Sequence, residues 1–90
     1  MAVEINIPPP LQALAEGVNK VNVSGSTAGE SLRELVRLYP QFRDKIFTQK
    51  GRLRSGINIF VNGKNVSPAQ LARRVSAGDK IHIAYTILGG

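Results

Sequence analysis

The sequence has no cysteine, which excludes disulfides, thiolate metal sites and a cysteine nucleophile within these 90 residues. Its single histidine, His82, has no carboxylate or second histidine beside it, so it does not indicate a metal site or a general base. No apolar run approaches the ~20 residues that cross a membrane, and the segment MAVEINIPPP does not resemble a signal peptide. We therefore expect a soluble cytoplasmic protein that binds no metal.

Acidic residues are scarce: six stand against twelve basic residues, which gives a net charge of +6. Such a balance favours an acidic partner, which can be nucleic acid, a membrane surface or an acidic protein face. The densest basic stretch is residues 43–54, but it lacks the interleaved aromatic residues that stack on bases. We interpret it first as a solvated loop and second as a contact for an acidic groove on a protein. We do not expect a membrane or nucleic acid as the partner.

Four segments alternate between apolar and polar residues, which is typical of strands with one buried face. They are residues 2–7, 20–24, 57–61 and 80–86. Residues 11–17 are predicted to be a turn or short loop, and Asn62-Gly63 predicts a hairpin with a brief return strand near Val66. The side chains predicted to face the core are Val3, Ile5, Ile7, Val21, Val23, Ile57, Ile59, Val61, Ile81, Ile83 and Tyr85.

One helix is predicted between the second and third strands. Thr27 and Glu30 have the spacing of a capping box, in which the hydroxyl caps the first turn and the carboxylate reaches back to the cap. Apolar residues then recur at helical spacing, and Pro40 ends the helix. Residues 41–56 form a polar, basic connection, and residues 67–70 begin a short helical turn. The predicted apolar contacts of the helix and of these segments are Leu32, Leu35, Val36, Tyr39, Phe42, Ile46, Phe47, Leu53, Leu71 and Val75.

The order of strand, strand, helix, strand, short strand and strand predicts an α+β fold. A single helix must pack on one face of a mixed sheet of four to five strands, in two layers. The other face is predicted to meet solvent, because its residues are mostly polar. Phe60 and Ala84 are its apolar exceptions, and with the ring of His82 they could form a small docking patch. A single surface aromatic without a function is the plainer interpretation of Phe60.

This layout, together with the Ile59-Phe60-Val61-Asn62-Gly63 strand and turn and the final Gly89-Gly90, resembles the β-grasp (ubiquitin-like) sulfur carriers of the MoaD/ThiS family. The Leu32-Arg33-Glu34-Leu35 helix and Tyr39-Pro40 are similar to the molybdopterin-type branch, although the proline often found before the diglycine is absent. The resemblance covers essentially the whole chain. It implies a β-grasp domain at residues 1–86 and a flexible tail at residues 87–90.

The diglycine suits chemistry at a chain end. An α-carboxyl has a pKa of about 3.3–3.7, so at neutral pH it is ionised and can attack an activated phosphorus. Glycine has no Cβ, so the tail can thread a narrow channel. In the family, the terminal carboxylate is adenylated and then converted to a thiocarboxylate, so the resemblance implies this role for Gly90.

The resemblance also implies the partners. Leu88, Gly89 and Ile87 would enter a partner's active site with Gly90, while Phe60, His82 and Ala84 would contact the partner. The partners would be an adenylating activating enzyme, which uses ATP, and a sulfur acceptor such as the large subunit of molybdopterin synthase. This chain would bind no cofactor and would not be a catalyst alone.

Alternatives stay open at this point. The sulfur pathway could instead be that of thiamine, cysteine or tRNA thiolation. The same end could join the chain to lysines as a protein modifier, and a basic RNA-binding module is the least favoured alternative.

Overall fold

The computed structural model describes residues 2–54, 56–66 and 71–85, except for the side chain of Tyr85. Its strands are β1 (Val3–Asn6), β2 (Lys20–Val23), β3 (Ile57–Val61), β4 (Lys64–Val66) and β5 (Lys80–Tyr85). The main helix is α1 (Ala28–Leu38), and two short helices follow it, the 3-10 helix η2 (Pro40–Phe42) and α2 (Arg43–Ile46). A further 3-10 helix, η1 (Pro9–Ala15), lies between β1 and β2.

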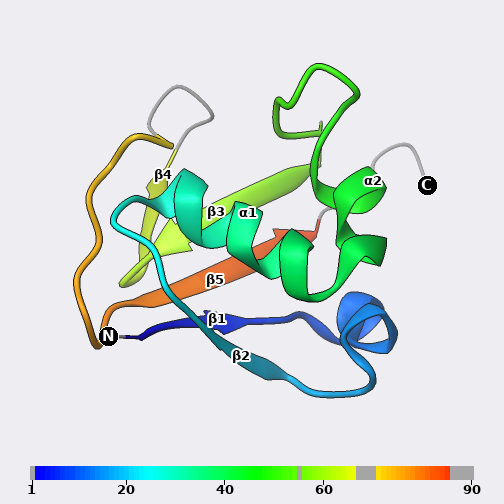
Figure 1. Ribbon diagram of the computed structural model, residues 1–90, viewed down its shortest axis with the longest axis horizontal. Coiled ribbons are helices and arrows are strands. Elements are labelled where there is room, and N and C mark those ends of the chain that lie inside the picture. Colours follow the sequence, from blue (N-terminus) through cyan, green and yellow to red (C-terminus); the bar gives the residue numbers. More distant parts are fainter. Residues whose placement is uncertain (1, 55, 67–70, 86–90) are drawn as a thin grey trace.

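The strands form one mixed sheet in the order β2-β1-β5-β3-β4. The parallel pair is β1 with β5, where Ile5 lies opposite Ile81, and the other pairs are antiparallel. Asn62 and Gly63 have φ values of 51° and 86°, the left-handed conformations that a tight two-residue hairpin between β3 and β4 requires. Figure 1 shows α1 lying across one face of this sheet. The predicted β-grasp architecture is confirmed.

The core lies between α1 and the sheet. Leu32 and Leu35 of α1 are fully buried, as are Ile5, Ile59 and Ile81 in the three central strands. Complete burial of such a side chain contributes about 1.5–3 kcal/mol relative to leaving it in water. The alternation predicted from the sequence therefore assigns the buried face correctly in each of these strands.

The start of α1 is capped much as predicted. The Glu30 N–H donates to the Thr27 hydroxyl oxygen at 3.1 Å. The Glu30 carboxylate, however, accepts from the N–H of Ser26 at 2.9 Å, one residue before the predicted cap residue. Gly25 lies against this turn, because an added Cβ would stand 2.5 Å from the Ser31 hydroxyl oxygen.

Residues 71–75 complete the helix start. The N–H groups of Ala28 and Gly29 donate to the carbonyls of Arg73 and Leu71, at 2.9 and 2.8 Å. These bonds satisfy donors that the first helical turn cannot pair internally. Val75 is buried and Leu71 packs against the core, as predicted.

The prediction of a turn or short loop at residues 11–17 was wrong, because most of this segment belongs to η1. Prolines at its first positions are already fixed near a helical φ, which favours a helical start. Leu11 and Ala15 are buried, so apolar contacts hold the helix on the core. Glu16, with φ of 57°, then ends it.

The predicted anchors of the basic connection are confirmed, since Phe42, Ile46, Phe47 and Leu53 are all buried. Phe47 and Leu53 also pair across an isolated β-bridge. The segment is therefore more ordered than a polar connection suggests.

Some predictions fall outside the described residues. They are the helical turn at residues 67–70, Thr86 at the end of the last strand, the tail at 87–90, and the inward side chain of Tyr85. The domain boundary at residue 86 therefore stays a prediction.

Candidate partner-binding surface

The predicted carrier end follows the central strand. Gly90, Gly89, Leu88 and Ile87 lie outside the described residues, and the last described residue is Tyr85 at the end of β5. β5 pairs with β1 on one side and along its length with β3 on the other, where Tyr85 lies opposite Ile57. β5 is therefore held by β1 in its first half and by β3 up to its last described residue.

The three predicted patch residues are brought together on the outer face. Phe60 of β3 lies directly opposite His82 of β5, and Ala84 is the next outward residue along β5. Residues directly opposite on antiparallel strands have Cβ atoms about 4.5–5.5 Å apart. Phe60 and Ala84 are half-buried and His82 is exposed. We call these three residues the outer patch.

The surroundings of the outer patch are polar. Asn65 of β4 flanks Phe60, and Asn58 lies opposite Ala84. On the other side, Asn6 of β1 lies opposite His82, and its amide donates to the Glu4 carboxylate at 3.1 Å. An apolar centre with a polar rim is the arrangement found in protein interfaces.

A hydrogen-bond network that the sequence analysis missed fixes the start of β5. The Asn62 amide donates to the Asp79 carboxylate at 3.1 Å, and the Asn62 side-chain oxygen accepts from the Lys80 N–H at 3.0 Å. The Ser76 N–H donates to the other Asp79 oxygen at 2.8 Å. This N–H and then the Asn62 amide hold the pKa of Asp79 below its ordinary value. The network links the β3–β4 turn to the loop before β5. It therefore helps to fix the pairing register of β3 and β5, the strands that carry the outer patch.

The carboxylates of α1 have structural partners. Glu30 belongs to the cap. Glu34 accepts from Arg37 one turn away, and this hydrogen bond lowers the pKa of Glu34. Among the described residues, no group of three or more His, Cys, Asp or Glu side chains is arranged to hold a metal ion.

Within the same part of the chain, no helix combines the length and the apolar character needed to cross a membrane.

Comparison with known proteins gives a consistent picture. Residues 5–90 match the ThiS family. A candidate sulfur carrier protein of Archaeoglobus fulgidus is 30% identical over 91 residues and covers 100% of both chains. Small archaeal modifier protein 1 of Haloferax volcanii is 32% identical over 72 residues, which cover 79% of each chain.

Solved structures share the fold. The crystal structure of the same Haloferax volcanii modifier superposes with a TM-score of 0.87, at 27% identity and with 100% of both chains covered. A chain of the BexX/CysO complex of Amycolatopsis orientalis has a TM-score of 0.85 at 24% identity, with 99% of this chain and 100% of that chain covered.

Proposed function

This chain belongs to the ThiS family of sulfur carriers and ubiquitin-like modifiers, and we propose that it carries sulfur as a thiocarboxylate on Gly90. The observation that carries this proposal is the extent of the family match, which starts in β1 and includes Gly89 and Gly90. A terminal diglycine alone would be a weak motif, and the β-grasp fold supplies the context that gives it meaning.

The proposed reaction has two steps. An oxygen of the Gly90 carboxylate attacks the α-phosphorus of ATP on an activating enzyme, and pyrophosphate leaves. A sulfide equivalent from a donor then attacks the acyl carbon, and AMP leaves with the electron pair of the broken C–O bond. The product is a thiocarboxylate, a sulfur nucleophile on a chain without cysteine. In this scheme ATP is bound by the activating enzyme in the cytoplasm.

The outer patch is our proposed contact for the activating enzyme and for the sulfur acceptor. Five residues follow Tyr85, and at about 3.3–3.6 Å each they reach at most about 18 Å. Gly90 must therefore react close to the end of β5, which also carries His82 and Ala84. An enzyme that covers the outer patch would have the tail within reach of its active site, with Ile87, Leu88 and Gly89 in the entry channel.

We propose the molybdopterin precursor as the final acceptor of sulfur, delivered with a molybdopterin synthase-type large subunit. Support comes from the Leu32-Arg33-Glu34-Leu35 helix and Tyr39-Pro40, which resemble that branch of the family. Thiamine, cysteine and tRNA thiolation are the alternative pathways. Purified thiocarboxylated chain offered to each acceptor enzyme in turn distinguishes them, because one acceptor should gain sulfur faster than the others.

A second candidate function is protein modification. It is favoured by the similarity to small archaeal modifier protein 1, at 32% identity. Conjugation would begin with the same adenylated Gly90 and end in an isopeptide bond to lysine. The two functions therefore differ in the acceptor and share the activation step.

The test is intact-mass spectrometry of the chain co-expressed with its activating enzyme. Replacement of one carboxylate oxygen by sulfur adds about 16 Da, as methionine oxidation also does. A thiol-selective alkylating reagent separates the two, because the chain has no cysteine to react. We expect an alkylatable shift that disappears when Gly90 is deleted. An unshifted mass under active co-expression would contradict the carrier proposal, and Gly90-linked lysine isopeptides would favour the modifier.

A further inference from the structure

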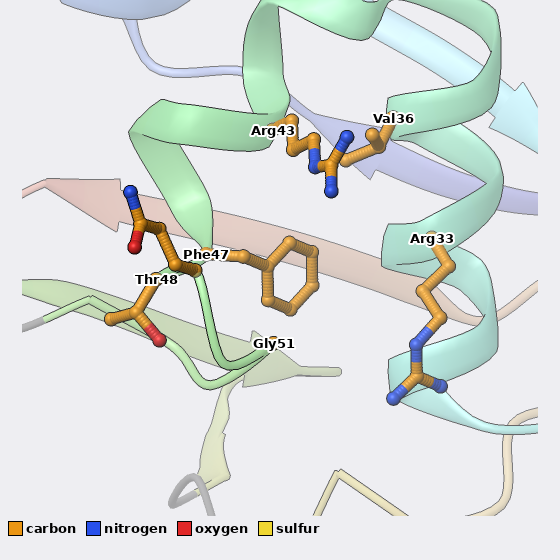
Figure 2. A pocket seen from close by; sticks show the side chains of 7 residues that line it. Arg33, Val36, Arg43, Phe47, Thr48 and Gly51 are labelled. Atoms are coloured by element: carbon orange, nitrogen blue, oxygen red, sulfur yellow. The ribbon is translucent and has the colours of Figure 1, made fainter.

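A hollow of about 280 Å³ opens between α1 and the segment that begins with α2. Arg33 and Val36 line it from α1, and Arg43, Phe47, Thr48 and Gly51 line it from the other side. Figure 2 shows the ring of Phe47 pointing toward α1, with the side chain of Arg43 above it and that of Arg33 across the hollow. We call this site the basic hollow.

The floor of the basic hollow is apolar and its rim is cationic. Phe47 is only 7% exposed and Val36 packs against the core, so both are held in place. Arg33 lies one turn before Val36 on the same helix face, and Arg43 lies one turn before Phe47. Both arginines are exposed. Two guanidinium groups therefore flank one apolar surface.

The charges of the rim are not neutralised within the part of the chain that the structure describes. Neither Arg33 nor Arg43 has a side-chain hydrogen bond or ion pair there. The nearest acidic groups on α1 already have partners, since Glu30 is bound to the Ser26 N–H and Glu34 to Arg37. An anionic ligand would supply both guanidinium groups with a counter-charge and with hydrogen-bond acceptors.

Thr48 adds one directed donor. Its hydroxyl oxygen accepts from the N–H groups of Lys50 and Arg52, both at 3.3 Å. Both lone pairs are then occupied, and the O–H hydrogen is free to donate. The hydroxyl thus favours a ligand oxygen that accepts, such as a carboxylate.

We infer that the basic hollow binds an acidic segment of a partner protein, which places one apolar side chain on Phe47 and Val36 and pairs flanking carboxylates with Arg33 and Arg43. The volume of the basic hollow, about 280 Å³, lies at the small end of the range for ligand pockets, about 300–1,000 Å³, and its buried apolar floor suits an apolar side chain. A bare phosphate would leave the apolar floor unused. The net charge of +6 would also steer an acidic partner toward the chain.

The basic hollow lies on the helix side of the sheet, whereas the outer patch lies on the opposite face (Figure 1). A segment bound here would leave the outer patch free. The contact is also independent of the chemistry at Gly90, so it can be tested on the unmodified full chain.

The probe is a synthetic peptide, acetyl-Asp-Glu-Asp-Leu-Glu-Asp-amide, titrated into the full chain by calorimetry. One reference peptide replaces leucine by serine, and another replaces every acid by its amide. The site variant is R33Q/R43Q. The matched control is K20Q/K80Q, which removes two charges from exposed lysines on the outer face. Thermal unfolding of each variant checks the fold, and R33Q and R43Q singly serve if the double variant unfolds.

We expect R33Q/R43Q to weaken binding about tenfold or more, because charge-assisted hydrogen bonds to arginine are among the strong ones, and K20Q/K80Q to leave it within about twofold. The serine and amide peptides should both bind more weakly than the leucine peptide. Equal weakening by the two double variants would overturn the site, because binding would then follow net charge alone. The proposal of an acidic protein segment would also be overturned if inorganic phosphate or ATP bound more tightly than the peptide and R33Q/R43Q abolished that binding.

Discussion

The outer patch and the basic hollow present side chains in different ways. Phe60, His82 and Ala84 stand on adjacent strands, so backbone pairing alone sets their spacing. Arg33 and Arg43 stand on separate helices, and buried anchors such as Phe42 and Phe47 set the distance between those helices. A change in the core beneath the basic hollow should therefore disturb it more than any comparable change disturbs the outer patch.

The largest effect should come from Phe42→Ala. Phe42 is fully buried at the bend between α1 and α2, and its ring packs edge-on against Tyr39 with centroids 6.4 Å apart. Truncation of a buried phenylalanine lowers the free energy of unfolding by about 3–5 kcal/mol. Urea denaturation measures this loss. Leu38→Ala is the control, because Leu38 is 43% exposed and its truncation should cost less than about 1 kcal/mol.

Phe60→Ala tests the role of the outer patch. We expect it to raise the KM of the activating enzyme for this chain about tenfold, which is about 1.4 kcal/mol of binding, with kcat little changed. Pyrophosphate release during adenylation measures both constants. Asn22→Ala, at an exposed position on the edge strand β2, which is not adjacent to β3 or β5, should leave KM unchanged. An unchanged KM for the Phe60→Ala chain would contradict the proposal that the outer patch contacts the activating enzyme.

Thr27→Ala tests how much the helix cap stabilises α1, the helix that lines one side of the basic hollow. Loss of the hydroxyl that accepts from the Glu30 N–H should cost about 1 kcal/mol of unfolding free energy. Thr27→Ser keeps the hydroxyl and should recover most of it. If alanine and serine behaved alike in thermal unfolding, the cap would not be what stabilises the start of α1.

Asp79→Asn should give the smallest effect, and a pH-dependent one. The folded-state pKa of Asp79 is lowered, first by the Ser76 N–H, so the ionised carboxylate stabilises the fold above its unfolded pKa of about 3.9. That contribution is lost as pH falls through the lower folded pKa. The melting temperature of Asp79→Asn should lie below wild type at pH 7 and approach it at acidic pH. A gap that stays constant with pH, or an equal gap for Asp44→Asn, would contradict this.

The contrast between the two regions also explains what the sequence could predict. Alternation along a strand assigns a face to each residue, so the neighbourhood of Phe60, His82 and Ala84 followed from local pattern and strand pairing. The anchors of residues 41–56 could be predicted for a different local reason, since isolated apolar residues in a polar segment tend to be buried.

The basic hollow could not be predicted in this way. Arg33 belongs to the predicted helix and Arg43 to a segment interpreted as a solvated loop, and only the turn through η2 brings α2 beside α1. The bond between Asn62 and Asp79 joins residues 17 apart, for which no local pattern exists. At η1, the segment predicted to be a turn or short loop is helical, and its two buried residues, Leu11 and Ala15, stand one turn apart.

The measurement that tests the central claim most directly is fragmentation of the alkylated, activated chain in the mass spectrometer. We predict that the alkyl group and the extra mass of about 16 Da appear together on the smallest C-terminal fragment that contains Gly90. The same label on a fragment without Gly90, or no label on a chain that has demonstrably been adenylated, would contradict the assignment of Gly90 as the sulfur-carrying residue.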